Sequence, residues 1–254
     1  PIIAPALGQV ILVFGPWRWI FGVLGLAGAA FLVWAGLRLP ETLKPENRLP
    51  IRPGRILSAF REALTHRLSL GYTLAMTAAT GALFGFINSS QQIFYDVFRA
   101  PGLFPVVFAG VAGGIAVASL LNARLVERLG SRRIAHTALL GFIGMGALHL
   151  LVSMTGHETL IAFALIQGAT MFCFGLMAGN FGSMAMEPMG HIAGTASSAQ
   201  GFVSTILGSL AGFAIGQSFD GSVTPMAAGV VICGAAALGA VLFAERGHLF
   251  HSRH

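Results

Sequence analysis

The stretch NARLVERLGSRRIAH, residues 122–136, is a short charged gap between two long apolar runs. VVFAGVAGGIAVASLL (106–121) precedes it, and TALLGFIGMGALHLLV (137–152) follows it. Four arginines and one glutamate lie in the gap, although only 9% of the whole chain is charged. Apolar runs of this length are typical of helices that cross a membrane. The pattern therefore predicts two membrane-spanning helices joined by a short basic connection.

The composition of the whole chain agrees with this reading. Of the 254 residues, 55% are hydrophobic, and the mean hydropathy is +0.79. Soluble domains carry about 25% charged residues, so a soluble protein with this composition could not cover its surface. The net charge of +6 does not indicate nucleic-acid binding, because the positive residues lie between apolar runs and form no single basic face. We predict an all-α polytopic membrane protein.

Counting apolar runs of about 20 residues divides the chain into spans. Residues 1–14 look like the second part of a span, and the chain starts without Met, so we expect a fragment of a longer protein. One full span precedes a long polar segment, and six follow it. The full spans are predicted at 19–38, 70–94, 103–123, 134–154, 159–185, 195–218 and 224–244.

The positive charges predict the orientation of these spans. All but two of the 15 Lys and Arg residues fall on one set of alternate connections, and only Arg18 and Arg99 fall on the other. Cytoplasmic loops of membrane proteins are enriched in Lys and Arg. We therefore expect the 39–68 loop, the 122–136 loop and the C-terminus to be cytoplasmic.

The polar segment 39–68 has two parts. Its first part contains four prolines and should be extended. In the second part Ile56, Leu57, Phe60 and Leu64 fall on one side of a possible short helix. This pattern fits an interfacial helix on the membrane surface, and an ordinary solvated linker helix fits it equally well.

Several short motifs resemble those of the major facilitator superfamily. LVERLGSRR resembles the second-half copy of its cytoplasmic loop motif, with Leu125, Arg128, Gly130, Arg132 and Arg133 in the matching positions. APALGQ (4–9) is similar to the antiporter motif of the fifth helix, through Pro5 and Gly8. HIAGTASSAQG (191–201) resembles the start of the eleventh helix in the bicyclomycin-resistance (Bcr/CflA) branch of drug:proton antiporters.

This resemblance implies the major facilitator fold, in which two six-helix halves surround a central substrate cavity. Residues 1–38 would then hold a partial fifth helix and the sixth helix of the N-terminal half. Residues 39–68 would be the central cytoplasmic loop, 69–245 the C-terminal six-helix half, and 246–254 a cytoplasmic tail. The resemblance also implies that the carboxylates that carry protons lie in the missing first half. None of the nine acidic residues lies in the middle of a predicted span.

Polar residues inside the spans are candidates for the substrate cavity. Gly81, Gly85, Asn88, Gln92 and Tyr95 recur at helical spacing and should share one face. That face either lines a cavity or forms hydrogen bonds between helices. The substrate-contact candidates are Asn88, Gln91, Gln92 and Tyr95, with Asn180 and Gln200 as weaker candidates together with Gln167.

Three further features of the spans and their connections stand out in the sequence. His149, inside a span, could relay protons or form a hydrogen bond with a neighbouring helix. Glu127 and Arg128 could pair with a neighbouring helix end and close the cytoplasmic side, together with Gly130, Arg132 and Arg133 as a gating motif. The glycines at four-residue spacing, Gly208, Gly212 and Gly216, should let helices approach closely.

The sequence contains no phosphate-binding loop, no enzyme-like cluster and no sign of a cofactor or metal site. Cys173 and Cys233 lie within apolar runs and should be reduced. We expect a secondary transporter, most simply a proton-coupled exporter of drugs or other amphipathic molecules, which acts as a monomer in the lipid bilayer. A metabolite or sugar exporter of the same fold, or a non-transporting receptor or assembly protein, are the alternatives.

Overall fold

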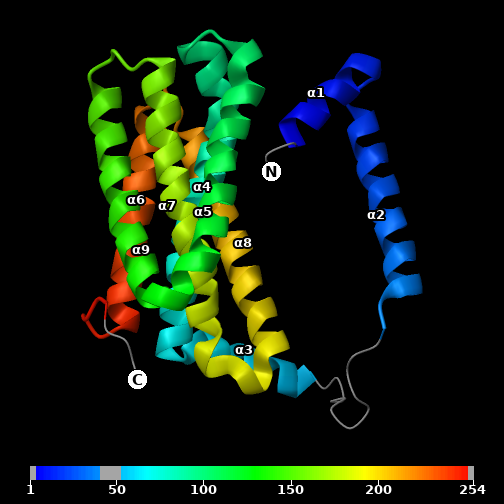
Figure 1. Ribbon diagram of the computed structural model, residues 1–254, viewed down its shortest axis with the longest axis vertical. Coiled ribbons are helices and arrows are strands. Elements are labelled where there is room, and N and C mark those ends of the chain that lie inside the picture. Colours follow the sequence, from blue (N-terminus) through cyan, green and yellow to red (C-terminus); the bar gives the residue numbers. More distant parts are fainter. Residues whose placement is uncertain (1–3, 41–52, 251–254) are drawn as a thin grey trace.

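The computed structural model describes residues 4–40 and 53–250, and within these ranges the chain is helical and contains no strand (Figure 1). The helices expected from the hydropathy pattern are all present. They are α1 (Ala4–Phe14), α2 (Arg18–Arg38), α3 (Pro53–Thr65), α4 (Arg67–Gln92), α5 (Phe104–Leu129), α6 (Ser131–Met154), α7 (Leu160–Met186), α8 (Ala193–Gln217) and α9 (Thr224–Ala244). Short π or 3-10 turns, η2 (Ile93–Val97), η3 (Pro101–Leu103) and η4 (Glu187–Ile192), link some of them.

Six stretches of the described chain are long and apolar enough to cross a membrane. One of them, Leu160–Gln217, contains α7, η4 and α8 together. At 1.5 Å per residue a continuous helix of this length would extend about 87 Å, whereas the hydrocarbon core is about 30 Å thick. The 3-10 turn η4, with Pro188 near its start, separates the two helices, and Figure 1 shows them joined at the lower end of the bundle. The two spans predicted here are therefore separate helices.

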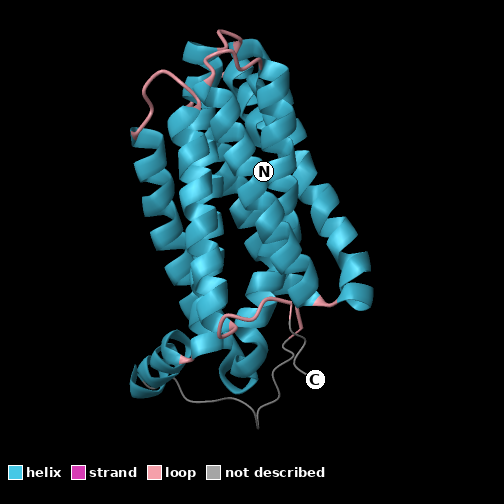
Figure 2. Ribbon diagram, turned by 90° about the vertical axis from the view of Figure 1, so that its left-hand side faces the viewer, coloured by secondary structure: helices cyan, strands magenta, loops and turns pink. Residues whose placement is uncertain are grey.

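Helices α4–α9 form one upright bundle, while α1 and α2 stand beside it (Figures 1 and 2). Within the bundle, α4 packs along α8 and α9, α7 packs along α5 and α6, and α4 and α7 contact each other. Helix α4 thus packs on two helices from the second half of the bundle, α7–α9. Helix α7 packs on two helices from the first half, α4–α6. Large side chains buried at these contacts include Phe142, Phe163 and Phe181. By contrast, α2 has no buried residue.

The contact between α4 and α8 depends on small residues from both helices. A Cβ atom added to Gly212 would overlap the Cβ of Phe84, and one added to Gly216 would lie 2.9 Å from the Cβ of Asn88. From the other side, a Cβ on Gly81 would lie 2.9 Å from that of Ala211. Close approach of this kind lets the backbones pack tightly where lipid offers no hydrophobic driving force.

Helix α3 lies against the lower end of the bundle and contacts α8 (Figure 1). Its buried face is formed by Ala59 and Ala63, and Phe60 packs nearby. Ile56 and Leu57 are exposed, whereas Phe60 and Leu64 are partly buried. The four apolar residues predicted to lie on one side of this helix are therefore not buried together. The proline-rich part of this segment, 41–52, lies outside the described residues.

A matched pair of glycine substitutions tests the close contact between α4 and α8. Gly212→Ala should lower the free energy of unfolding by about 1–3 kcal/mol, because the new methyl group forces the helices apart. Gly239→Ala, in α9, meets no atom within 4 Å and should be neutral or slightly stabilising, since alanine favours helix. Thermal unfolding of both variants in detergent, followed by circular dichroism, measures the difference. Equal stability of the two variants would contradict the packing argument.

Candidate functional site

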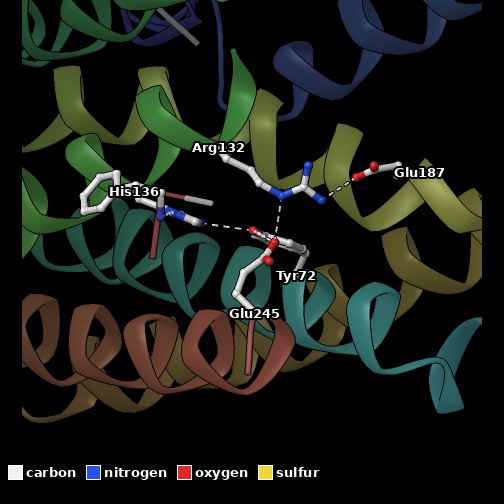
Figure 3. A network of polar contacts seen from close by, with 6 residues as sticks. Tyr72, Arg132, His136, Glu187 and Glu245 are labelled. Carbon is white, nitrogen blue, oxygen red and sulfur yellow. Dashed lines mark hydrogen bonds and ion pairs between the residues drawn. The ribbon is translucent and has the colours of Figure 1, made fainter. Parts of the chain in front are cut away.

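A network of charged and polar side chains ties four helix ends together at the lower end of the bundle (Figure 3). At its centre is Arg132, in the first turn of α6. Its Nε donates to Oε1 of Glu245 at 2.9 Å, and its Nη2 donates to Oε2 of Glu187 at 2.8 Å. Glu245 directly follows α9, and Glu187 begins the η4 turn after α7. One guanidinium group therefore joins three helix ends that are far apart in the sequence.

Tyr72, in the second turn of α4, adds a fourth helix to the network. Its hydroxyl donates to Oε1 of Glu245 at 2.8 Å and lies 3.0 Å from Nε2 of His136. The backbone N–H of Phe250 donates to Nδ1 of the same histidine at 3.0 Å. Nδ1 of His136 must therefore be the unprotonated nitrogen, which leaves Nε2 to donate to the tyrosine oxygen. The result is one directed chain of hydrogen bonds from Phe250 through His136 and Tyr72 to Glu245.

Burial makes this network important for the fold. The side chain of Glu245 is 2% exposed and that of Arg132 is 13% exposed. A buried carboxylate is costly unless it is paired and hydrogen-bonded. Arg132 and Tyr72 both meet this need, so the ends of α4, α6 and α9 are held in one arrangement.

The predicted gating motif is only partly involved in this network. Arg132 is at its centre, but Glu127 and Arg128 are exposed and form no ion pair with another described residue. Gly130 joins α5 to α6 with a φ of 77°, a left-handed conformation that favours glycine. Arg133 is exposed beside it. The role of this motif in gating stays a prediction, and the pairing expected for Glu127 and Arg128 is not seen within the described residues.

The polar stripe predicted on α4 faces α8 at Gly81, Gly85 and Asn88 and is interrupted after Gln92. Gly81 and Gly85 point at α8, where added Cβ atoms would meet Ala211 and Ile215. Asn88, Gln91, Gln92 and Tyr95 are exposed at the other end of the helix. From Ile93 the backbone changes to a π turn, in which the N–H of Phe98 bonds to the carbonyl of Ile93. This turn breaks the α-helical spacing that placed Tyr95 on the stripe.

The weaker cavity candidates form hydrogen bonds inside the bundle. Nδ2 of Asn180 donates to Oδ1 of Asn122 and to the carbonyl of Leu176, both at 2.7 Å. Nε2 of Gln200 donates to Oγ of Ser69 at 3.0 Å and to the carbonyl of Ala185 at 3.1 Å. Gln167 is fully buried, and neither of its amide atoms has a partner among the described residues. Asn180 and Gln200 therefore form hydrogen bonds between helices, which was the alternative to lining a substrate cavity.

A groove with a volume of about 540 Å³ lies between α4, α7 and α8. Hydroxyl groups dominate its polar lining, methionines supply apolar surface, and none of the lining residues is charged. Gln200 is the one predicted cavity residue found there. The others in the lining were not singled out from the sequence, because serine and threonine are common in membrane helices. They include Thr73, Thr80, Ser183, Ser197, Ser204 and Thr205.

His149 is paired with Glu158, an acid in the connection between α6 and α7. Its Nε2 lies 2.7 Å from Oε1 of Glu158, and the two side chains are 1% and 5% exposed. The ring of Phe163 packs against the imidazole, with 5.5 Å between the ring centres. Glu158 directly precedes Thr159, whose hydroxyl accepts from the N–H of Ala162 and caps α7. The hydrogen bond expected for His149 therefore exists, but its partner lies in the connection between α6 and α7.

The fold, the apolar spans and the buried polar network together define a multi-pass helical membrane protein. Residues 1–213 match the Major Facilitator Superfamily, and the chain belongs to this family of membrane transporters. It is 29% identical over 250 residues to an uncharacterized MFS-type transporter, YdgK, of Bacillus subtilis, a match that covers 96% of this chain and 60% of the relative.

Two further relatives are named for drug resistance. The chain is 28% identical to a bicyclomycin resistance protein homolog of Haemophilus influenzae, over 89% of this chain and 57% of the relative. It is 26% identical to the multidrug resistance protein MdtL of Escherichia coli, over 79% of this chain and 49% of the relative. The chain thus spans about half to three-fifths of the length of these relatives. They are transporters and not enzymes, and the described residues contain no cluster of three or more metal-ligating side chains.

The two tyrosines of the chain allow a direct test of the network at the lower end of the bundle. Tyr72→Phe should lower the free energy of unfolding by about 1–3 kcal/mol, because the buried carboxylate of Glu245 loses a donor. Tyr95→Phe, at an exposed position, should leave stability unchanged. Chemical unfolding of both variants in detergent provides the measurement. If the network does not stabilise the fold, the two variants will show the same small change in the free energy of unfolding.

A double-mutant cycle tests the buried pair of His149 and Glu158. His149→Phe and Glu158→Leu each leave one partner buried alone, and each should cost about 3–5 kcal/mol of unfolding free energy. The double variant should cost clearly less than the sum of the two, because no unpaired polar group remains. Additive effects in thermal unfolding would show that the two side chains do not stabilise each other.

Proposed function

We propose that this chain forms the C-terminal half, with the end of the N-terminal half, of a proton-coupled transporter that exports drugs or other small amphipathic molecules. Membership of the Major Facilitator Superfamily supports transport, and the names of two relatives support drug export. The observation that carries the proposal is the groove between α4, α7 and α8. It offers hydroxyl groups and methionine surface side by side, which suits molecules with both polar and apolar parts.

In this proposal the groove is one wall of the substrate cavity. Gln200 contributes an amide whose carbonyl oxygen is available beside the hydroxyl groups. The exposed residues Asn88, Gln91, Gln92 and Tyr95 extend the same wall towards the opposite end of α4, while Asn180 supports it through its bond to Asn122. Pro5 and Gly8 lie in α1, the helix that carries the antiporter motif. The facing wall belongs to the N-terminal half.

Alternating access requires each half to move as one body. The network around Arg132 supplies this rigidity at one end, because it links the ends of α4, α6, α7 and α9. The close packing of α4 on α8 brings in a further helix. Substrate could then bind between the halves while the helices within this half keep their contacts.

Proton coupling is proposed to depend on carboxylates outside this half. Within the described residues, the buried acids Glu158 and Glu245 are both engaged with a basic partner. Three segments lie at the same end of the bundle: the basic connection between α5 and α6, helix α3, and the residues after α9 (Figure 1). We propose that this end is cytoplasmic, in a bacterial inner membrane, and that the transporter is a monomer.

Export assays on the full-length gene product test the function and the groove together. Cells that express it should accumulate less of a fluorescent amphipathic dye, and a protonophore should abolish the difference. Thr205→Trp, which fills the groove, should reduce export at least about tenfold by steric exclusion. Leu207→Trp, two residues further and on the other side of α8, is the matched control and should export normally.

Three outcomes would count against parts of this proposal. Export that persists with the protonophore would exclude proton coupling. Normal export by Thr205→Trp would remove the groove from the substrate path. Efflux of a sugar or metabolite, with no effect on any dye or drug, would favour the metabolite exporter of the same fold.

A further inference from the structure

A second cavity lies at the connection between α5 and α6 and adjoins the groove through Ser183, which lines both. Its volume is about 570 Å³, and its lining is mainly polar. Three arginines line it, together with the hydroxyl groups of Ser131 and Ser183 and the carboxylate of Glu187. The remaining lining residues are Leu129, Gly130, Met184 and Phe250.

The arginines of this cavity have unused hydrogen-bonding capacity. Arg128 and Arg133 form no ion pair with another described residue. Arg132 uses its Nε for Glu245 and its Nη2 for Glu187, which leaves Nη1 without a partner among the described residues. The one acid in the lining, Glu187, already binds Arg132 through Oε2. The cavity therefore carries an excess of positive charge.

The first turn of α6 adds backbone donors to the same cavity. Ser131, Arg132 and Arg133 are the first three residues of this 24-residue helix, and all three line the cavity. Their N–H groups have no acceptor within the helix, and Gly130 at the N-cap has no side chain that could cap them. The helix dipole further favours negative charge at this end. Arginine side chains and free N–H groups together are suited to the oxygens of a phosphate group.

The position of the cavity identifies the source of the phosphate. It lies at the common end of two membrane-spanning helices, which is the depth of the lipid headgroups. Leu129 and Phe250 are 48% and 40% exposed at its edge, so apolar surface adjoins the charged lining. A soluble phosphate would not use this apolar edge, whereas the glycerol and acyl chains of a lipid would cover it. Basic pockets between membrane helices are known to suit anionic headgroups.

We propose that this cavity binds the phosphate of an anionic phospholipid, such as phosphatidylglycerol. The phosphate contacts Arg128, Arg133 and the first N–H groups of α6, and the acyl chains pass Leu129 and run along the bundle into the membrane. The bound lipid neutralises Arg128 and Arg133, which have no ion-pair partner among the described residues. It lies beside Arg132 and so adjoins the network that holds the helix ends together.

Native mass spectrometry of the protein in a neutral detergent, titrated with phosphatidylglycerol or phosphatidylcholine, tests this site. The unaltered protein should retain phosphatidylglycerol and prefer it to phosphatidylcholine. The double variant Arg128→Gln/Arg133→Gln should bind phosphatidylglycerol about tenfold more weakly or worse, because each arginine near the surface contributes to anionic lipid binding. Arg128→Lys/Arg133→Lys should keep most of the affinity, since it keeps the charge.

The control variant is Arg38→Gln/Arg61→Gln, which loses the same charge at exposed positions that do not line the cavity. It should bind phosphatidylglycerol normally. An equal loss in both Gln variants would overturn the proposal, because binding would then follow net charge alone. Equal binding of the two lipids would also overturn it, and so would displacement of phosphatidylglycerol by inorganic phosphate. Thermal unfolding in the same detergent confirms that the variants are folded.

Discussion

The hydrocarbon core of a membrane offers no hydrogen-bond partner, and this constraint accounts for most of what the structure shows. Every backbone group within the core must be satisfied inside the protein, which the described residues achieve with helices alone. Polar side chains are under the same constraint. Glu245 is buried with Arg132 and Tyr72, His149 with Glu158, and Asn180 with Asn122. Each of these contacts joins two segments that are separate in the sequence.

The same constraint explains why small residues hold the helices together. Without a hydrophobic driving force between helices in lipid, close van der Waals packing has to stabilise the bundle. Glycines on α8 meet Phe84 and Asn88 of α4, and Gly81 of α4 meets Ala211 in return. Polar side chains also gather at two hollows of the bundle, the hydroxyl-lined groove and the arginine-lined cavity. These are the two places that we propose as binding sites.

Hydropathy was sufficient to locate the helices, since each span must provide about 20 apolar residues whatever its neighbours are. It could not show that α4 packs on α8 and α9 while α7 packs on α5 and α6. The π turn after Gln92 was also missed, because a local change in hydrogen bonding leaves no hydropathy signal. Among the site residues, Arg132 was found through its motif. Its partners Glu187 and Glu245 were predicted only to lie outside the middle of a span.

The sequence by itself determined the class of protein, the approximate positions of the spans, the resemblance to the family, and the collection of basic residues on alternate connections. These properties depend on composition and on short motifs, which are local. Only the tertiary structure decided which polar residues meet. Tyr72, His136 and Glu245 form one chain of hydrogen bonds across up to 173 residues of sequence. Such partners are fixed by the three-dimensional packing of the helices, because burial makes an unpaired charge costly and so selects the arrangement in which each charge has a partner.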